Sequence, residues 1–390
     1  MSIAVDRDQA FIREVRRIAE DIAGPNADDV DVNARFPSES IDALKAERAL
    51  SAYIPERYGG GGVSFEAIAA ACYELGRRCG ASAMVFAMHQ IQIAAIARHL
   101  DDAPWFEDYL RSVADEQRLV ASVTSEVGTG GDLGKSIAAV TSSGLGRSSF
   151  EKQAPTVSYG AYADDLLTTL RRAPDAEPGD QVVALTHRDQ HTLEQTGTWD
   201  PLGMRGTCSP GYVVRAEFPD EQVLATPFST VDTESMVPIS HILWSHLWLG
   251  IATDAFDRSR AFVRAQARSR PDQIPPTAPR LSQLMSELSP LRAEVSSALR
   301  DFSEVADDDR ERLSTMAMIL RFNNLKIAAS EQAPRVCQGA MSVCGIVGYK
   351  NDTPFSIGRH LRDTMSACLM VANDRIHQTN AGLLLIAKEV

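Results

Sequence analysis

The sequence predicts an α+β multidomain protein, mostly α, in which an N-terminal helical domain, a middle antiparallel β-domain and a C-terminal four-helix bundle follow one another. Two observations predict this order. Apolar residues recur at helical spacing before residue 110 and again after residue 235, whereas short β-rich runs separated by Gly, Asp and Pro fill the region between them. A chain of 390 residues is long enough for two or three domains. We expect domains at 1–116, 117–234 and 235–390.

The first domain is predicted to be built from amphipathic helices. Phe11, Val15, Ile18 and Ile22 fall on one helical face. A second helix is expected over Pro37–Leu50, with Ser38 or Ser40 able to cap its first turn.

Four consecutive glycines, 59–62, come next and are followed by Ser64 and an Ala-rich apolar helix. No Lys-Ser/Thr pair follows them, as a phosphate-binding P-loop requires, so we expect a helix–turn–helix connection with Ser64 as N-cap. His89 lies in an apolar helical run, which favours a buried histidine with satisfied hydrogen bonds; the wall of a substrate cavity is the alternative.

The middle domain is expected to hold a small antiparallel sheet or barrel, because its β-rich runs are short and regularly punctuated. The expected strands are Leu119–Thr124, Asp165–Leu170, Gln181–Leu185, Tyr212–Ala216 and Gln222–Leu224. The first one leads into a Thr/Ser/Gly-rich turn that ends at Asp132. Such a turn exposes backbone N–H groups and hydroxyls, which suit a phosphate or the polar edge of an aromatic ring, although most Gly-rich turns only reverse the chain.

Long helices are predicted for the last domain. The range His241–Arg270 ends before Pro271 and carries one apolar stripe, formed by Trp244, Trp248, Ile251 and Ala255. Further helices are expected over Leu281–Val305, Arg310–Gly339 and Asp374–Lys388, and Asp307–Asp309 is expected to be a solvated loop. Four such helices after a β-domain are typical of a helical bundle.

Bulk composition excludes several classes of partner. The net charge of −13 argues against a nucleic-acid partner and against a polybasic membrane surface, and a polyanionic ligand would need a local cluster of Arg or Lys. Six cysteines without a CxxC pair indicate reduced thiols, and no metal-ligand spacing occurs among them or the eight histidines. The first twenty residues lack a signal-peptide apolar block, and no apolar run approaches the ~20 residues of a membrane span. We expect a cytoplasmic protein.

Several motifs together resemble the acyl-CoA dehydrogenase family over nearly the whole chain. Residues 125–132, Ser-Glu-Val-Gly-Thr-Gly-Gly-Asp, are similar to its flavin-contacting Thr-Glu-Pro-Gly-Ala-Gly-Ser-Asp loop. The run Leu202–Ser209 is similar to its Leu-Gly-Met-Arg-Gly-Ser block, whose role is mainly to order the β-domain. Shorter matches are Glu151-Lys152 with Ala163-Asp164, the turn 343–349 that ends in Gly-Tyr, and Arg362-Asp363.

The resemblance implies that FAD binds between the β-domain and the bundle. The positions that match its flavin contacts are Ser122, Thr124, Ser125, Gly130, Gly131 and Ser158. Arg270 matches the arginine that reaches the diphosphate of a neighbouring subunit's flavin, although a helix-end cation is the simpler alternative. A flavin site shared across an interface implies a homodimer or homotetramer.

The catalytic base is where this chain departs from the family. Family dehydrogenases take the α-proton of the substrate with a glutamate while the β-hydride passes to flavin N5. Asn373 stands at the usual glutamate position, and Trp244 stands at the position that a subset of the family uses. Asp374, one residue away, is the natural substitute, with an N-cap role as its alternative; His246 and His377 are lesser candidates.

Three functions remain open at this point. The first is an FAD-dependent dehydrogenase of an acyl thioester, either acyl-CoA or acyl-carrier-protein, with an electron-transfer flavoprotein or similar acceptor. The second is a flavin monooxygenase of the same fold, which needs no α-proton base; such enzymes commonly carry a histidine after the Arg-Asp, and 364–374 contains none. The third is a base-less subunit that completes the flavin site of a partner in a mixed oligomer.

Overall fold

The computed structural model describes residues 3–100, 103–130, 132–305 and 307–387. The chain begins with a long helix, in which α1 (Ile3–Ile18), the π-helical turn η1 (Ala19–Ala23) and α2 (Gly24–Val32) follow without a break. The other helices of this region are α3 (Ser38–Ala46), α4 (Phe65–Gly76), α5 (Gly80–Ala97) and α6 (Pro104–Glu116), with short 3₁₀ turns at Ala49–Ser51 and Glu56–Tyr58.

Serine caps were predicted at the N-termini of α3 and α4, and the structure agrees with one of the two predictions. Ser64 Oγ accepts a 3.2 Å hydrogen bond from Ala67 N at the start of α4, so the N-cap prediction is confirmed. The prediction for α3 is wrong, because Pro37 is its N-cap and no side chain caps it. Ser40 instead faces inward, where its hydroxyl accepts a 3.0 Å hydrogen bond from Ser82 Oγ of α5.

The middle region forms two sheets. One has the strand order β1 (Val120–Val123), β4 (Asp165–Arg171), β5 (Gln181–His187). The other has the order β2 (Thr141–Gly144), β3 (Arg147–Ala154), β7 (Tyr212–Pro219), β6 (His191–Gln195). All pairs are antiparallel except β1 with β4, which run parallel with Val120 opposite Asp165. A parallel pair is feasible here because the chain between these strands is long and passes through the second sheet.

The strand predictions hold for the buried strands and fail for others. β1, β4, β5 and β7 are found close to their expected positions, but β2, β3 and β6 were not predicted. β2 is exposed along its length and β6 nearly so, so neither carries an apolar alternation. Gln222–Leu224 is not a strand: Val223 makes only an isolated bridge to Ala184, after a 3₁₀ turn over Asp220–Gln222.

The third region opens with an unbroken helix that crosses the expected boundary at 234/235. It consists of α7 (Phe228–Val231), the π-helical turn η7 (Asp232–Met236) and α8 (Val237–Ser269). The next helices are α9 (Ala278–Ser303), α10 (Met316–Cys344), α11 (Ile346–Tyr349), α12 (Gly358–Met365) and α13 (Asn373–Ile386). The acidic run expected as a loop, Asp307–Asp309, is exposed and begins a 3₁₀ segment, η8 (Asp307–Ser314), so α10 starts later than predicted.

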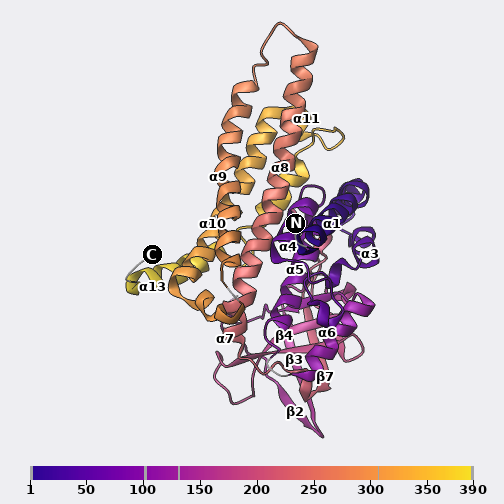
Figure 1. Cartoon of the computed structure of the whole chain (residues 1–390), viewed down its shortest axis with the longest axis vertical. Helices are drawn as coiled ribbons and strands as arrows, with labels where there is room; N and C mark the ends of the chain where they lie inside the picture. Colours follow the sequence, from indigo (N-terminus) through magenta and orange to yellow (C-terminus); the bar gives the residue numbers. More distant parts are fainter. Residues whose placement is uncertain (1–2, 101–102, 131, 306, 388–390) are drawn as a thin grey trace.

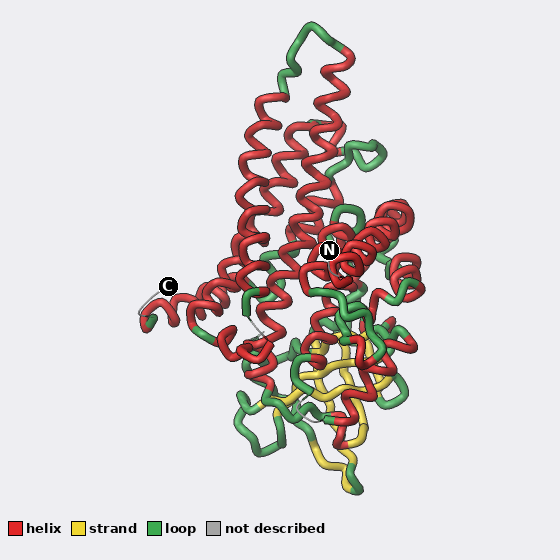
Figure 2. Tube along the Cα trace, viewed as in Figure 1, coloured by secondary structure: helices red, strands yellow, loops and turns green. Residues whose placement is uncertain are grey.

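The bundle has a different fourth helix from the one predicted. Figure 1 shows α8, α9 and α10 side by side, while α13 points sideways away from them. The short α12 packs against α8 and α10, and His360 Nε2 lies 2.8 Å from Asp254 Oδ2 of α8. Figure 2 shows the strands gathered at one end of the molecule, below the helices.

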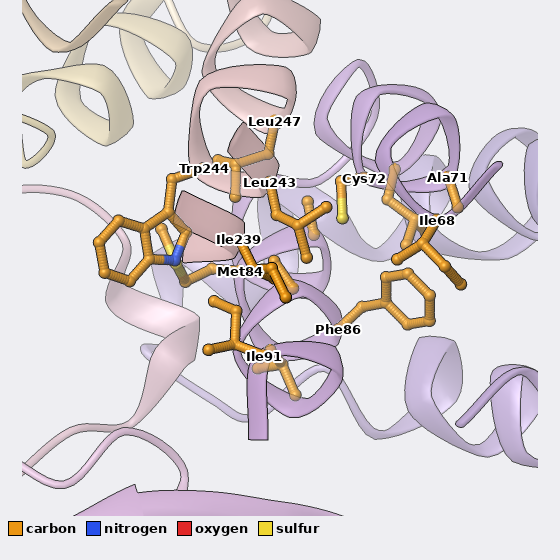
Figure 3. Packing of buried hydrophobic residues seen from close by; sticks show 14 of the residues in the cluster. Ile68, Ala71, Cys72, Met84, Phe86, Ile91, Ile239, Leu243, Trp244 and Leu247 are labelled. Atoms are coloured by element: carbon orange, nitrogen blue, oxygen red, sulfur yellow. The ribbon is translucent and has the colours of Figure 1, made fainter. Parts of the chain in front are cut away.

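The core that supports the site lies between α4, α5 and α8 (Figure 3). These helices pack closely because glycines face each other: a Cβ built on Gly250 of α8 would lie 2.3 Å from Tyr73 O of α4. The expectation that no apolar run approaches a membrane span is wrong for α5, which alone among the described residues is long and apolar enough to cross one. However, 89% of α5 is buried inside the fold, as in the core helix of a globular domain. Trp244 projects from α8 away from Ile68 and Ala71.

Candidate active site

A cavity of about 680 Å³ lies where five parts of the chain meet, and its walls are largely apolar. These parts are α5, the end of β1 with the turn after it, the loop 199–209, the α7–α8 helix and the segment 362–375, and Thr156 and Ser158 add a further wall from the segment after β3. Ser122, Thr124, Ser125, Gly130 and Ser158 line this cavity. The structure therefore brings together five of the six positions predicted to contact flavin; the sixth, Gly131, lies outside the described residues.

The polar groups of these five residues are partly free. Ser125 Oγ donates to Thr156 O at 2.8 Å, and Ser158 Oγ accepts from Ser209 Oγ at 3.0 Å, which leaves the Ser158 hydroxyl hydrogen available to a ligand. The side chains of Ser122 and Thr124 have no hydrogen-bond partner among the residues that the structure describes. Gly130 has a φ of +60°, a left-handed conformation that favours glycine.

The glutamate of the same turn has a structural role. Glu126 accepts hydrogen bonds from Ile137 N (3.0 Å), Ala138 N (2.6 Å) and Ser136 Oγ (2.9 Å), and Lys152 Nζ lies 3.7 Å away. Burial lowers the pKa of Lys152 to about 8. These contacts fasten the turn to the sheet, and so the Glu and Lys of the matched motifs hold the cavity wall in place without lining it.

The loop 199–209 joins the sheet region to the helices. Met204 N donates to Asp363 Oδ1 of α12 at 2.7 Å, and Arg205 Nε donates to Asp31 O at 2.8 Å. A Cβ on Gly203 would lie 2.1 Å from Arg362 O, so only glycine allows this approach. Burial raises the pKa of Asp363 to about 6. Trp199 lines the cavity from this loop, and its Nε1 is a buried donor without a partner in the described part of the chain.

The residues weighed as catalytic bases lie away from the cavity. Asp374 is exposed in the first turn of α13, and Ala372, not Asp374, is the N-cap. Asn373 is buried, and its Oδ1 accepts a 2.7 Å hydrogen bond from Lys326 Nζ. His377 is exposed. His246 is buried, donates from Nδ1 to Ile242 O, and has its pKa lowered to about 4 by burial. Because none of these four lines the cavity, the expectation for Asp374 finds no support in its position.

Among the described residues one carboxylate lines the cavity, and it was not among the predicted site residues. Asp232 of η7 has no hydrogen bond or ion pair with any described residue, and burial raises its pKa to about 7. It belongs to a stripe with Phe228, Met236, Ser240 and Trp244, spaced about one helical turn apart on the cavity side.

A signal for this stripe exists in the sequence. The helix was expected to begin at His241, but α8 begins at Val237 and has Pro238 in its first turn, where a proline fits. Counting back from Trp244 in steps of four residues, through Ser240 and Met236, leads to Asp232.

Two further groups shape the cavity. Trp244 Nε1 and Gln92 Oε1 are buried and lack partners within the described ranges, and both residues line it. His241 donates from Nδ1 to Phe322 O at 3.1 Å, and its pKa is lowered to about 3 by burial, so it presents a neutral ring.

His89 lies outside the lining of the cavity. Its Nε2 donates to Leu50 O and its Nδ1 accepts from Val120 N, so the prediction of a buried histidine with satisfied hydrogen bonds is confirmed.

Arg270 is remote from the cavity of its own chain. It is exposed at the C-cap of α8, at the far end of the bundle from the strands (Figure 1). Twenty-six residues separate it from Trp244, which corresponds to about 39 Å along a helix. A role at a neighbouring subunit's flavin stays a prediction.

Comparisons with known proteins identify the family. Residues 6–117 match the family model for the acyl-CoA dehydrogenase N-terminal domain, and residues 242–374 match that for the acyl-CoA dehydrogenase C-terminal domain. A probable acyl-CoA dehydrogenase of Bacillus subtilis (strain 168), YngJ, is 22% identical over 381 residues, which cover 93% of this chain and 94% of that protein.

Solved structures show the same fold. A nitrososynthase from Micromonospora carbonacea var. africana superposes with a TM-score of 0.82 at 19% identity, over 99% of this chain and 98% of that one. The dibenzothiophene monooxygenase TdsC from Paenibacillus sp. A11-2 has a TM-score of 0.79 at 19% identity, over 97% of each chain, and was also solved with FMN bound. Since the two family models together span more than half of the sequence, the chain belongs to the acyl-CoA dehydrogenase family.

Proposed function

We propose that this protein is a flavin-dependent oxidoreductase that dehydrogenates an acyl thioester, carried by CoA or by an acyl-carrier protein, with Asp232 as proton acceptor. One observation carries the proposal: five positions of the flavin-loop type and a carboxylate without a partner among the described residues share one largely apolar cavity. Family membership supports the oxidoreductase class.

The residues present fit a flavin. Ser122, Thr124 and Ser158 offer hydroxyls to the polar edge of an isoalloxazine ring, and Gly130 leaves room beside the turn. Trp199 and Thr156 both line the cavity, and the indole of Trp199 offers an aromatic wall to the ring. When bound, a flavin supplies a two-electron acceptor for the β-hydride of the substrate. FAD is the expected form, and the FMN-bound relative makes FMN the alternative.

The other side of the cavity suits an acyl chain and a proton transfer. Met84, Met88 and Ile91 provide an apolar lining. A carboxylate whose pKa is raised to about 7 by burial is matched to accepting a proton near neutral pH. Asp232 Oδ would accept the α-proton, and the product would be the α,β-unsaturated thioester once the β-hydride has also left to the bound flavin.

A flavin-dependent monooxygenase is the second candidate. It is favoured because neither position at which the family carries its catalytic base holds a carboxylate here. One position is Asn373, which accepts a hydrogen bond from Lys326, and the other is Trp244, which lines the cavity. The structurally similar TdsC and nitrososynthase are named for oxygen-dependent or N-oxidising activities. In that case Asp232 and the neutral ring of His241 would orient the substrate.

The assembly is part of the same proposal. Ile346 and Tyr349 expose 71% and 69% of their surface around the short α11, an apolar area that fits a contact between copies of the chain. We propose a homodimer or homotetramer. A mixed oligomer with a catalytic partner is the alternative, and an electron-transfer flavoprotein or similar protein is the proposed acceptor.

The experiment starts with the visible spectrum of the purified protein, followed by anaerobic titration with acyl-CoAs and acyl-carrier proteins. Bleaching of a yellow protein supports dehydrogenation. Oxygen consumption with added reduced flavin, without bleaching, supports the monooxygenase, and colour that appears only with a partner chain supports the mixed oligomer.

The base is tested by Asp232→Asn, with the exposed Asp374→Asn as matched control. We expect at least a hundredfold slower bleaching for Asp232→Asn and wild-type behaviour for the control. Equal rates for both variants would exclude Asp232.

A further inference from the structure

The cavity contains a cation without a counterion among the described residues. Arg375, the third residue of α13, lines the cavity and is partly buried. Its guanidinium reaches back over the turn after β1, so that a Cβ built on Gly130 would lie 3.4 Å from Arg375 Nη2. No hydrogen bond or ion pair joins its side chain to any residue within the described ranges. Partial burial of an unpaired guanidinium costs free energy, and binding of an anion would offset that cost.

The other candidate cations are already used or distant. Arg362 also lines the cavity, but it is paired with Asp31 and donates to Leu202 O at 3.0 Å. Arg270 lies about 39 Å along α8 from Trp244. Since the net charge of the chain is −13, an anion entering the cavity depends on a local positive charge, and Arg375 supplies it.

The helix itself gains nothing from this arginine. A cation in the first turn of a helix opposes the helix dipole, whereas an acid such as the exposed Asp374 next to it is favourable there. The backbone that sets where α13 begins is strained, because Val371 and Ala372 have positive φ values of 49° and 24°. The strained residues Val371 and Ala372 place α13 so that the Arg375 side chain lies beside Gly130, and their conformation lowers local stability.

We propose that Arg375 binds the phosphate of the flavin, at the point where the phosphate passes the Gly130 turn. The proposal rests on the flavin binding proposed above. A guanidinium offers a planar pair of donors to two phosphate oxygens. Gly130 has no side chain, and its left-handed backbone keeps the turn open to the same group. Within one chain the phosphate is thus held by α13 and the β1 turn.

The test compares flavins with and without a phosphate. The full-length protein, freed of flavin, is titrated with FMN, FAD and riboflavin, and binding is followed by the quenching of flavin fluorescence. We expect wild type to prefer FMN to riboflavin by about tenfold or more, as one charge-assisted pair allows. Arg375→Gln should abolish most of that preference while leaving the affinity for riboflavin unchanged. Arg375→Lys should retain part of it.

Arg13→Gln is the matched control, because Arg13 is an exposed arginine of α1 outside the cavity. Circular dichroism and a melting curve establish that each variant is folded. An unchanged FMN-to-riboflavin ratio in Arg375→Gln would overturn the inference about Arg375 while leaving flavin binding intact. Failure of wild type to bind any of the three flavins would overturn flavin binding, and this inference with it.

A second arm distinguishes the source of the phosphate, because CoA also carries phosphates. The flavin-loaded protein is titrated with an acyl-CoA and with the corresponding acyl-pantetheine. We expect Arg375→Gln to leave the preference between these two ligands unchanged. Loss of the preference for the CoA ester, together with an intact FMN-to-riboflavin ratio, would assign Arg375 to the thioester and refute the flavin phosphate.

Discussion

Lys326 Nζ of α10 donates a 2.7 Å hydrogen bond to Asn373 Oδ1, the side chain of the first residue of α13. Both side chains are buried, and Asn373 Nδ2 also donates to Ser330 Oγ at 3.1 Å. Burial lowers the pKa of Lys326 to about 8. Asn373, which the sequence resemblance predicts at the family's glutamate position, is therefore part of the attachment of α13 to the bundle, two residues before Arg375.

Replacing Asn373 by alanine should destabilise the protein by about 1–3 kcal/mol, because Lys326 is left buried without its acceptor. Urea unfolding measures this change. Asp374→Ala is the control, since Asp374 is exposed, and should stay within about 0.5 kcal/mol of wild type. Equal stability of the two variants would show that the Lys326 hydrogen bond is not important for the fold.

Gly203→Ala should destabilise the joint between the loop 199–209 and α12. The new Cβ would lie 2.1 Å from Arg362 O, a backbone atom that cannot rotate away, so we expect a loss of about 1–3 kcal/mol. The melting temperature reports it. Gly197→Ala, where no atom lies within 4 Å of the added Cβ, serves as control and should melt like wild type.

The protein should lose stability as the pH falls from 6.5 towards 4. Burial lowers the pKa of His89, His246 and His360 to about 4, so these rings stay neutral in the fold while the unfolded chain takes up protons from pH 6.5 downward. For these three rings the unfolded state binds more protons in this window and is favoured by acidification, and they outnumber Asp232 and Asp363, whose raised pKa values act in the opposite direction. Each such ring contributes up to about 2 kcal/mol between pH 7 and 5.

His246→Leu isolates one of these contributions, because within the described part of the chain His246 hydrogen-bonds only to the Ile242 carbonyl of its own helix. Urea unfolding at several pH values should give a flatter dependence for this variant than for wild type. A slope identical to that of wild type would mean that His246 is protonated in the folded state.

Trp244 should limit the size of the substrate. It is 8% exposed and forms the wall of the cavity on α8. Trp244→Ala should cost about 3–5 kcal/mol and extend bleaching to bulkier acyl groups, whereas Trp244→Phe should cost less than about 1.5 kcal/mol and keep the wild-type preference. A panel of acyl thioesters of increasing size measures the shift, and an unchanged size preference in Trp244→Ala would place the acyl group elsewhere.

The sequence predicted secondary structure correctly where buried apolar residues recur at a regular spacing. The long helices, four of the buried strands and the clustering of the flavin-loop positions follow from apolar spacing and matched motifs. The exposed strands β2 and β6 lack an apolar pattern; β2 pairs with β3 through a tight turn after Gly144, whereas β6 pairs with β7 across the longer segment 196–211.

The sequence by itself determined the family, the order of the helical and β regions, and five of the residues at the cavity. Only the tertiary structure decided which charged groups face that cavity. Asp374 and Arg375 are neighbours in the chain, yet the helix turns one to solvent and the other towards Gly130, and Asp232 comes from a turn far away in sequence. Side-chain direction and the meeting of distant segments depend on packing, which no local pattern records.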